Sequence, residues 1–477
     1  MTSYLNCNYD IMPFILNTFT VSIKSLTSLE KSMLKNLMLF LDNNENKKYR
    51  NYNRIKCTFI WIAIETNRCL KSLLKACLTY LVGYHMIIMK IIWYFMFIMI
   101  TRSIFNLVNE ALFKDNVILI FGTRRVGKTT LLQEIIKYHE ENGKRCLYLD
   151  CEHSSSRRKL DTTNDEDLRI LVEDLDILAI DEAQNIETIG RTLKIIHDTF
   201  PHVQVIATGS SSFDLANKTG EPLVGRMRQF LLYPLSVREI WKQEGIVKAT
   251  AGIDNFLRLG LYPKIYDLSE KDAIKELDAL VGGYLYKDLL TFDGIRNSEQ
   301  IHTLLEALAL QVGSEVSYYE LAQGLQISTN TVKKYIDLLE KCYVIFKLPA
   351  LSRNIRSELL GNRTRKIYFY DIGVRNALIE GFQPLKLRPD SGAIWENFCI
   401  VELKKKAQRE DRRPRYYFWR TVDQKEIDLL EEEDGAFNVY EFKLGDSKKA
   451  KLPKGFDEHY NVKSFNVITK DNWHRFF

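Results

Sequence analysis

Hydrophobic residues in the second quarter of the chain form short continuous runs, each followed by polar residues. The first run, "VILIF" at 117–121, is rich in β-branched residues and ends at a glycine, which predicts a buried parallel strand. Apolar positions then recur at helical spacing over 131–136, and Gly143 is a suitable helix stop. Two further segments, "DILAIDEAQ" at 176–184 and "VQVIATGSS" at 203–211, again lead from an apolar run into polar residues. The pattern predicts an α/β domain with parallel strands.

The segment between the first strand and the first helix is "GTRRVGKTT" at 122–130, which fits the phosphate-binding pattern G-x-x-x-x-G-K-[ST]. Its glycines let the backbone approach the phosphates, and the loop amides and the helix N-terminus direct positive charge at them. Lys128 can reach the β- and γ-phosphates, and Thr129 can ligate Mg²⁺. The alternative is a chance glycine turn before a helix. The segment predicts ATP and Mg²⁺ as cofactors, with these nucleotide-binding residues: Gly122, Arg125, Gly127, Lys128, Thr129 and Thr130.

Hydrolysis requires a second acidic site at the end of another parallel strand, and Asp181 and Glu182 provide one. Asp181 would hold the Mg²⁺ through water, and Glu182 would polarise the attacking water. The alternative is a strand that ends in solvated acids. We therefore predict Glu182 and Lys128 as catalytic residues, and Thr129 and Asp181 as the residues that hold the metal.

Two more segments could contact the γ-phosphate. The hydroxyls of Thr208 and Ser210, at the end of the third apolar run, are placed to sense it, although an ordinary exit from a strand is an equal alternative. Arg226 and Arg228 precede another strand and could reach a γ-phosphate of the same chain or of a neighbouring copy. A plain surface role is the alternative for both arginines.

Global charge gives no support for nucleic-acid binding. The chain has a formal net charge of +6, but residues 1–98 contain 12 Lys and Arg against 5 Asp and Glu, a surplus of +7. The remainder therefore carries about −1, so only local patches can indicate DNA. The eight cysteines include no C-x-x-C pair, which predicts reduced thiols in a cytoplasmic protein, and neither zinc nor disulfides.

The first 98 residues differ from the rest in composition. Residues 76–100 are long enough and apolar enough to suggest a membrane span, but His85 and Lys90 near the centre count against it. We favour the interpretation that everything before Met99 is a translated leader, because a short amphipathic helix and the first strand follow directly.

Residues 316–351 predict two short helices separated by a tight turn, followed by two strands that close the unit as a wing. The second helix begins at Ser328 or Thr329, either of which is a good N-cap. Its polar face and the basic residues of the wing are suited to DNA, although winged helices also dock proteins. The predicted DNA-binding residues are Thr329, Asn330, Lys333, Lys334, Arg353, Arg356, Arg363 and Arg365, and Lys366 belongs to the same basic patch. A second local basic segment is "KKKAQREDRRPR" at 404–415.

The last 90 residues predict an amphipathic helix that carries Glu396, then a strand, then a hairpin. Because side chains alternate along a strand, Asp428, Glu441 and Lys443 can converge beside Glu396. Two carboxylates there could hold Mg²⁺ against a phosphodiester, and the lysine could stabilise developing negative charge. The alternative is a half-buried hairpin with a solvated charged face.

These motifs together resemble a prokaryotic family of AAA-type ATPases with a C-terminal domain of unknown function, from about Met99 to the end. The resemblance rests on "GTRRVGKTTLL", "LAIDEAQ", "ATGSSSFDL", "LVGRMRQFLLYPLSVREI", "YFYDIGVRNAL", "WENFCIVEL" and "EIDLL…YEFKLG". It implies an α/β P-loop AAA-type ATPase domain, then a winged helix-turn-helix and a PD-(D/E)xK nuclease-like α/β domain. The expected divisions are an extension at 1–98, the ATPase domain at 99–245, a helical region at 246–310, the winged helix at 311–370 and the nuclease-like domain at 371–477.

Three functions fit the sequence. The favoured one is a Mg²⁺-dependent ATPase whose nucleotide state controls a winged helix that engages double-stranded DNA and a nuclease-like domain. The second is a nucleotide-gated switch whose nuclease-like fold only grips DNA or a protein partner. The third places the chain at a membrane through residues 76–100. Assembly of the chain into a homo-oligomer is compatible with each of them.

Overall fold

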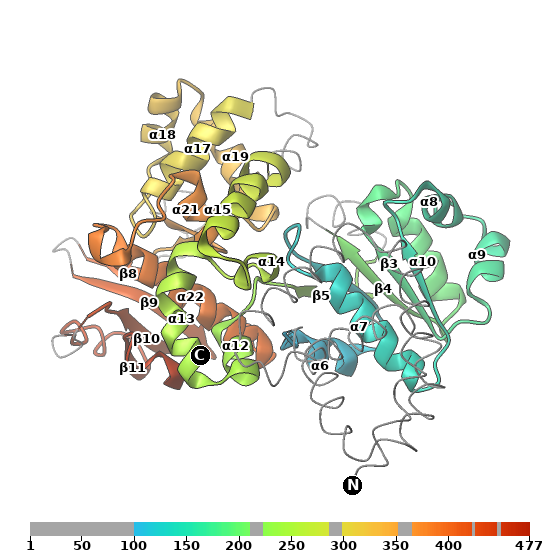
Figure 1. Ribbon diagram of the computed structural model, residues 1–477. Helices are drawn as coiled ribbons and strands as arrows, with labels where there is room; N and C mark the ends of the chain where they lie inside the picture. The colour runs from blue at the N-terminus through green and yellow to red at the C-terminus, as the bar shows by residue number, and fades with distance from the viewer. Residues whose placement is uncertain (1–99, 210–222, 286–297, 352–364, 422–424, 446–449) are drawn as a thin grey trace, which may run out of the picture. The chain divides into compact units, whose positions relative to one another are not determined.

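The computed structural model describes residues 100–209, 223–285, 298–351, 365–421, 425–445 and 450–477 (Figure 1). The chain divides into two units, Met1–Met99 and Ile100–Phe477. The first unit lies outside the described residues, and so does all but Ile100 of the apolar segment at 76–100. Both expectations for the N-terminal extension are therefore untested.

The first half of the described chain contains a five-stranded sheet in the order β2-β3-β4-β1-β5, in which every neighbouring pair is parallel. Its strands are β1 (Val117–Phe121), β2 (Cys146–Asp150), β3 (Ile177–Asp181), β4 (Gln204–Gly209) and β5 (Met227–Leu231). The helices that accompany it are α6 (Ile104–Ala111), α7 (Lys128–Glu141), α8 (Ser154–Leu160), α9 (Asp165–Val172) and α10 (Ile189–Thr199), with a short 3₁₀ turn η4 (Ala183–Asn185). This agrees with the predicted α/β domain.

Alternation of side chains along β1 explains why helices cover both faces of this sheet. Ile118 and Ile120 belong to one buried cluster with Leu131 of α7. Leu119 belongs to the other, with Leu193 of α10. All five residues of β1 are buried, as expected for a parallel strand between two layers of helices. The strands therefore end at one common edge, where the loop after β1 and the acids after β3 lie.

A helical region follows the sheet. It contains α12 (Val237–Glu244), α13 (Ile246–Leu259), α14 (Pro263–Tyr266), α15 (Glu270–Ala279), the π-helical turn η5 (Leu280–Leu285) and α17 (Ser298–Leu310). A capping box starts α12: the Ser236 hydroxyl accepts from the Glu239 amide at 3.1 Å, and the Glu239 carboxylate accepts from the Ser236 amide at 2.7 Å.

The next unit has two helices, α18 (Tyr318–Leu325) and α19 (Thr329–Lys341), and an antiparallel pair of strands, β6 (Ile345–Pro349) and β7 (Arg365–Phe369). Ser328 caps α19 by accepting from the Thr331 amide at 3.0 Å. Val332, Tyr335, Ile336 and Leu339 are all buried and form the packing stripe of α19.

The C-terminal part is built on a long helix, α22 (Ser391–Arg409), preceded by α21 (Ile372–Leu378) and the short turn η6 (Leu385–Leu387). A four-stranded sheet follows in the order β11-β10-β9-β8, and a 3₁₀ turn η7 (Trp473–Arg475) ends the chain. Its strands are β8 (Arg415–Arg420), β9 (Glu426–Glu433), β10 (Ala436–Phe442) and β11 (Val462–Ile468). Strand β11 runs parallel to β10, and the other pairs are antiparallel.

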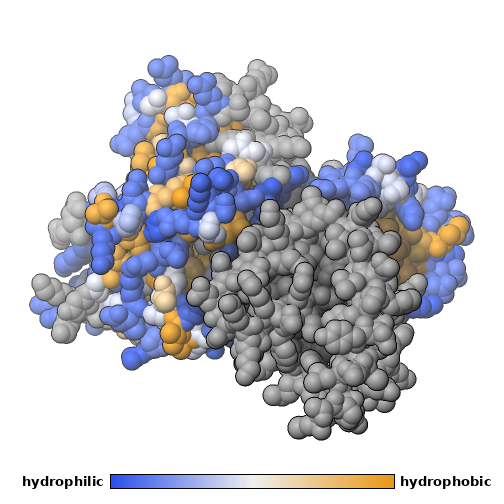
Figure 2. Space-filling view, viewed as in Figure 1, coloured by the Kyte–Doolittle hydropathy of each residue, from blue (hydrophilic) through white to orange (hydrophobic). Residues whose placement is uncertain are grey.

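Hydrophobic surface is scattered on the face drawn in Figure 2, where orange residues are interspersed among blue ones. Among the described residues, the exposed large hydrophobic side chains are far apart in the chain and include Ile170, Val247, Leu310 and Leu387. Of the helices in the described ranges, none has both the length and the apolar character needed to cross a membrane.

Candidate functional site

The loop after β1 holds its backbone in a shape that requires glycine at two positions. Gly127 immediately precedes α7 with φ of 98°, a left-handed conformation that other residues rarely adopt. At Gly122 a Cβ atom would lie only 2.6 Å from the carbonyl oxygen of Leu232. Both predicted glycines are therefore needed for the loop conformation itself.

Lys128 folds back over this loop. Its ammonium donates to the carbonyl oxygens of Gly122 and Thr123, at 3.0 and 3.1 Å, and lies 4.0 Å from Glu182. The side chain is buried, and its two carbonyl partners carry no formal negative charge. The buried cation thus sits inside the loop, in contact with groups that a phosphate oxygen could replace.

Asp181, the last residue of β3, gathers three hydroxyl groups. Its Oδ2 accepts from Thr129 at 2.6 Å and from Tyr148 at 3.0 Å, and its Oδ1 accepts from Thr208. Oxygen donors of this kind suit Mg²⁺, and the pair Thr129 and Asp181 fits the metal site that the sequence predicts. Thr208 contacts Asp181 and also accepts from the Glu182 amide at 3.1 Å, which places it beside both acids.

Tyr148 was not predicted from the sequence. It comes from β2, the strand next to β3, and burial followed by the nearby Asp181 raises its pKa, so its hydroxyl remains a donor. The sequence does place Tyr148 two residues before the end of β2. This position indicates a contact with Asp181 only once β2 is known to lie beside β3 in the sheet.

Glu182 follows directly with a left-handed backbone, φ 52°, which is uncommon for a residue with a side chain. Gln184 donates to its carboxylate at 2.5 Å. A strained residue with an oriented carboxylate at the end of a buried strand is typical of a functional position.

The predicted Arg125 lies in the loop and forms an ion pair with Glu276 of α15 at 2.8 Å. Tyr262 supports the same loop by donating to the hydroxyl of Thr123 at 2.8 Å. Thr130 is exposed in the first turn of α7. The helical region after the sheet therefore contacts the phosphate-binding loop, and the role of Arg125 toward a nucleotide stays a prediction.

The position of Arg226 contradicts part of the prediction that it reaches a γ-phosphate. It precedes β5, its carbonyl accepts from the amide of Val117 at the start of β1, and its guanidinium pairs with Asp198 at 2.8 Å. The phosphate-binding loop follows the other end of β1, about five residues or roughly 16 Å away. Contact with the nucleotide of its own chain is thus wrong, and contact with a neighbour's is untested. Ser210 lies outside the described residues.

The predicted acidic cluster at the C-terminal sheet is partly assembled. Lys443 Nζ lies 2.9 Å from Glu441 and 4.0 Å from Asp428, and Asp428 accepts from the Phe442 amide at 2.8 Å. Burial raises the pKa of Asp428 and of Glu441. Glu396 is close enough to Asp428 for their charges to repel, and burial raises its pKa to about 7, against the opposing effect of Lys366.

Lys366 is the residue whose prediction is overturned here. It was placed in the basic patch of the wing, but it is only 3% exposed and points into the acidic cluster. Its ammonium lies 2.6 Å from Glu426 and 3.1 Å from Glu396, and Tyr368 of the same strand also donates to Glu396. The reason is strand alternation and pairing: β7 lies against the interior, so Lys366 and Tyr368 face the buried acids. No group of three or more metal-ligating side chains occurs in the described ranges.

The other predicted DNA-binding residues are distributed as follows. Thr329, Asn330, Lys333 and Lys334 are exposed on α19. Arg365 stacks over the ring of Tyr318, 4.7 Å from its centroid, and donates to its hydroxyl at 3.2 Å. Arg353, Arg356 and Arg363 lie outside the described residues.

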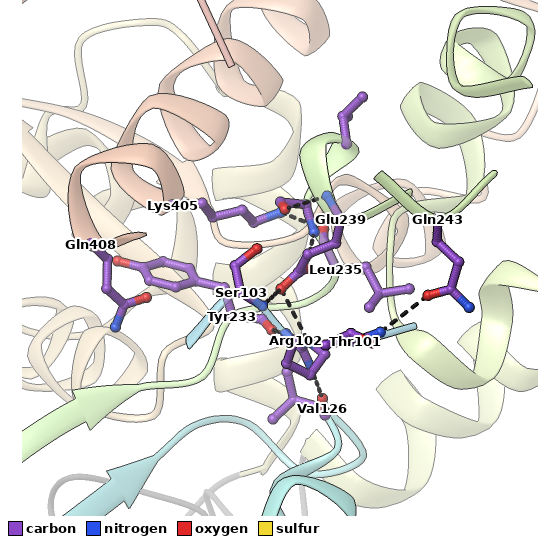
Figure 3. A network of polar contacts seen from close by, with 12 residues as sticks. Thr101, Arg102, Ser103, Val126, Tyr233, Leu235, Glu239, Gln243, Lys405 and Gln408 are labelled. Carbon is purple, nitrogen blue, oxygen red and sulfur yellow. Dashed lines mark hydrogen bonds and ion pairs between the residues drawn. The ribbon is translucent and has the colours of Figure 1, made fainter. Parts of the chain in front are cut away.

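A buried polar network connects the phosphate-binding loop with α12 (Figure 3). The guanidinium of Arg102 donates to the carbonyl of Val126 at 2.9 Å, also donates to the carbonyl of Tyr233, and lies 3.4 Å from Glu239. Burial alone would raise the pKa of Glu239, but Arg102 and the amides of Ser236 and Ser103 outweigh it and hold that pKa low. The acid is therefore a fixed negative charge, and Arg102 links it to the carbonyl of Val126, the residue before Gly127 in the loop.

The same network continues into α22. The amide of Val237 donates to Glu402 at 3.0 Å, and Lys405 donates to the carbonyl of Leu235 and to Glu402, each at 2.8 Å. Gln408, one turn further, donates to the carbonyl of Leu231 at 2.7 Å. Helix α22 also carries Glu396, so one rigid element joins the ATPase-like sheet to the acidic cluster. The contacts of Arg102 with Tyr233 and Glu239, and those of α22 with residues 231–237, were not predicted, because each links residues more than 130 positions apart.

Comparison with protein-family models divides the chain into three regions. Residues 114–241 match an AAA domain, residues 250–387 match a domain of unknown function (DUF8612), and residues 391–474 match a second domain of unknown function (DUF4143). The AAA match covers the loop after β1 and the acids after β3.

Among solved structures, domain III of the replication initiation protein DnaA from Thermotoga maritima is 19% identical, with a TM-score of 0.25 over 50% of this chain and 88% of that one. A DnaA bound to AMPPCP and single-stranded DNA gives a TM-score of 0.24 at 15% identity, over 50% of this chain and 86% of that one. These likenesses are too distant to support an argument about function.

Curated relatives are closer. An uncharacterized protein of Methanocaldococcus jannaschii is 27% identical over 308 residues, which is 56% of this chain and 63% of that protein. An uncharacterized protein of Mycobacterium tuberculosis is 30% identical over 340 residues, 70% of this chain and 71% of that protein. The chain therefore belongs to the family of this uncharacterized mycobacterial protein, and its residues 114–241 form an AAA domain of the P-loop ATPase type.

Proposed function

We propose that this protein is a Mg²⁺-dependent ATPase. The observation that carries the proposal is the contact of 2.6 Å between Thr129 of the phosphate-binding loop and Asp181 at the end of β3, with Lys128 and Glu182 directly beside it. A loop that binds phosphates and a carboxylate that supports a metal ion are both needed for ATP hydrolysis, and here they converge from separate strands.

Each residue has a distinct role in this proposal. Lys128 exchanges its bonds to the loop carbonyls for phosphate oxygens and stabilises their negative charge. Thr129 and Asp181 would hold Mg²⁺, and the ion when bound would neutralise charge on the phosphates. Glu182, held by Gln184, orients the attacking water and accepts its proton. Thr208 keeps Asp181 in place.

The test separates binding from turnover. Lys128→Ala should lose binding of a fluorescent ATP analogue, whereas Glu182→Gln should bind it normally and hydrolyse ATP at least about 100-fold more slowly. Lys137→Ala on the exposed part of α7 and Glu187→Gln on the surface are matched controls that should retain both properties. Wild-type turnover by Glu182→Gln would contradict the assignment of the base.

We further propose that the nucleotide state controls how the C-terminal half engages double-stranded DNA through a winged helix. The exposed polar residues at the start of α19 support the contact, and the Arg102 network together with α22 supports the coupling. DNA affinity at fixed salt should differ between no nucleotide, ADP and a non-hydrolysable ATP analogue by roughly 5–150-fold. Equal affinity in all three states would remove the coupling from the proposal.

A second function is favoured by Lys366. Its ammonium lies between Glu396 and Glu426, where a nuclease of the PD-(D/E)xK type would need its carboxylates available for a metal ion. The alternative is therefore a nucleotide-gated switch whose nuclease-like fold docks DNA or a protein without cleaving. Cleavage of linear and supercoiled DNA by the wild type, abolished in Asp428→Ala with Glu441→Ala, would reject this alternative. Assembly into homo-oligomers, with Arg226 reaching a neighbour's nucleotide, also remains a proposal.

A further inference from the structure

A cavity of about 630 Å³ lies where the edge strand β5 faces the last turns of α22 and the start of β8. All five residues of β5 line it. Strand β5 is the outer strand of its sheet and pairs with β1 alone in that sheet, so one row of its backbone amides and carbonyls faces outward. The two sides of the cavity are joined at one end, where Gln408 donates to the carbonyl of Leu231, and by the ion pair between Arg228 and Asp411 at 2.9 Å.

The charged side chains of this cavity are mostly basic. Its lining includes four basic residues, Arg228, Lys404, Arg412 and Arg413, against one acid, Asp411. Asp411 neutralises Arg228, and Glu431 and Glu433 neutralise Arg412, at 2.6 and 3.1 Å. In the described ranges no acid pairs with Lys404 or Arg413. Neither cation is therefore compensated by a salt bridge, and burial lowers the pKa of Lys404 to about 8, against the opposing charge of Glu340.

Aromatic rings line the same cavity, among them Tyr343, Tyr416 and Phe230. Lys404 lies over the ring of Tyr416, with its ammonium 4.7 Å from the ring centroid, and 4.9 Å from that of Phe346. The hydroxyl of Tyr416 is buried without a hydrogen-bond partner in the described part of the chain. An unsatisfied buried hydroxyl is costly in a folded protein, which indicates that a polar group belongs beside it.

We propose that this cavity binds single-stranded nucleic acid. Lys404 and Arg413 would contact phosphates, the tyrosine rings would stack on bases, and the Tyr416 hydroxyl would bond a base or a sugar oxygen. Aromatic rings that alternate with cations are the usual surface for unpaired strands, because every base has a face that can stack. The site is separate from α19, which we propose for duplex DNA, and needs neither ATP hydrolysis nor the acidic cluster.

Other ligands fit these features less well. In a duplex the bases already stack on one another, so they leave no free base faces for the tyrosine rings. An acidic peptide would satisfy the cations and leave the rings without a matching partner. A free nucleotide shares the chemistry of one unit of a strand, so the experiment must distinguish it from the polymer.

The test measures binding of a fluorescent 12-residue oligo-dT to the full chain by anisotropy, without nucleotide. The double variant Lys404→Met, Arg413→Gln should weaken binding at least tenfold, and the slope of log affinity against log salt should shrink by about 0.7 for each lost contact. Tyr416→Leu should weaken binding roughly fivefold or more by loss of stacking, and Tyr416→Phe should have a smaller effect. Methionine keeps the packing of Lys404 between the two rings.

Lys406→Met is the matched control, because Lys406 lies two residues along the same helix and does not line the cavity. It should bind the strand like the wild type, and all variants should retain the wild-type unfolding temperature within a few degrees. Lys128→Ala should also bind the strand normally, which separates failure here from failure of the proposed ATPase.

Several outcomes would overturn the inference. One is equal affinity of the wild type, the double variant and Lys406→Met. Another is competition by poly-glutamate that is as effective as competition by unlabelled oligo-dT, which would mean that the site recognises negative charge alone. A third is competition by free dTMP at the same nucleotide concentration, which would assign the cavity to mononucleotides. Tighter binding of duplex DNA than of the single strand would reject single-stranded nucleic acid as the ligand.

Discussion

The phosphate-binding loop and the C-terminal acidic cluster each bring a buried lysine close to carboxylates, and they satisfy that lysine in opposite ways. Lys128 donates to two neutral carbonyls and stays 4.0 Å from Glu182. Lys366 forms short ion pairs with Glu426 and Glu396, at 2.6 and 3.1 Å. The first lysine can exchange its partners for a phosphate at small cost, whereas the second compensates acids that would otherwise be buried unpaired.

The carboxylates differ in the same sense. Asp181 is bound by the hydroxyls of Thr129, Tyr148 and Thr208, none of which carries charge, so its negative charge remains for a cation. Glu396 receives Lys366 and the hydroxyl of Tyr368. The comparison indicates that lysine and acid in proximity are not enough to define a catalytic site. What matters is whether the positive charge is already neutralised within the fold.

The largest expected effect is on the loop. Replacing Asp181 with Asn keeps the size of the side chain, removes the charge that supports Mg²⁺ and turns one of its two accepting oxygens into an NH₂ donor. ATPase activity should fall at least about 100-fold at every Mg²⁺ concentration, with the unfolding temperature almost unchanged. Steady-state phosphate release measures the first and differential scanning fluorimetry the second. Retained activity would show that this carboxylate is not the metal-supporting acid.

The matching experiment on the cluster is Lys366→Met, for which the expected effect is on stability. Removing one partner of a buried ion pair leaves the carboxylates uncompensated and should cost about 3–5 kcal/mol in the free energy of unfolding. Lys443→Met is the control, since Lys443 is 43% exposed and its loss should cost less than about 1 kcal/mol. Denaturant unfolding compares the two. Similar losses would remove the contrast between the two lysines.

The same variant tests what occupies the cluster. With Lys366 gone, its carboxylates are open to a divalent cation, and added Mn²⁺ should restore part of the lost stability, whereas the wild type should respond weakly. The restored part should grow with Mn²⁺ concentration as ligand binding to the native state requires. If the wild type is stabilised as strongly as the variant, then Lys366 does not take the place of a metal ion.

A smaller effect is expected from the raised pKa of Glu396. Its native pKa of about 7 lies above the ordinary value of 4.5. Between these values the native protein retains a proton that the unfolded chain has released, so the free energy of unfolding falls as the pH rises, by up to about 3 kcal/mol. Glu396→Gln should flatten this fall between pH 4.5 and pH 7. Urea unfolding at half-unit pH steps measures it, and an unchanged profile in the variant would contradict the raised pKa.

The phosphate-binding loop and the acidic cluster also differ in how far their residues could be placed from the sequence. The loop, the acids after β3 and the exposed positions of α19 follow from local spacing, because each motif is continuous in the sequence. The faces of the hairpin around Asp428 and Glu441 follow from strand alternation. Lys366 was misplaced because its environment depends on how β7 packs against α22 and β9, and neither contact is encoded locally.

Strand β11, Tyr148 and the Arg102 network were missed for a related reason. The parallel pairing of β10 with β11 spans a connection of about 20 residues, and the order of strands in the first sheet determines which tyrosine meets Asp181. Arg102 meets Glu239 across 137 positions. Only the tertiary fold brings such groups together, and a single sequence carries no periodic signal for them.

The smallest expected effect concerns Arg125, the charged residue of the loop whose role toward nucleotide is open. Its ion pair with Glu276 joins two side chains that are each more than a quarter exposed, so Arg125→Gln should change the free energy of unfolding by less than about 1 kcal/mol. If the guanidinium also contacts ATP, this variant should weaken nucleotide binding a few-fold.

Glu276→Gln breaks the same ion pair and leaves the arginine in place, so it should bind ATP as well as the wild type or better. Both variants remove the ion pair, but only Arg125→Gln should lower the affinity for ATP. Titration with a fluorescent ATP analogue measures this affinity. Equal weakening by both would mean that Arg125 serves only to hold the loop against α15, and the loop would then bind phosphate through Lys128 and its backbone amides alone.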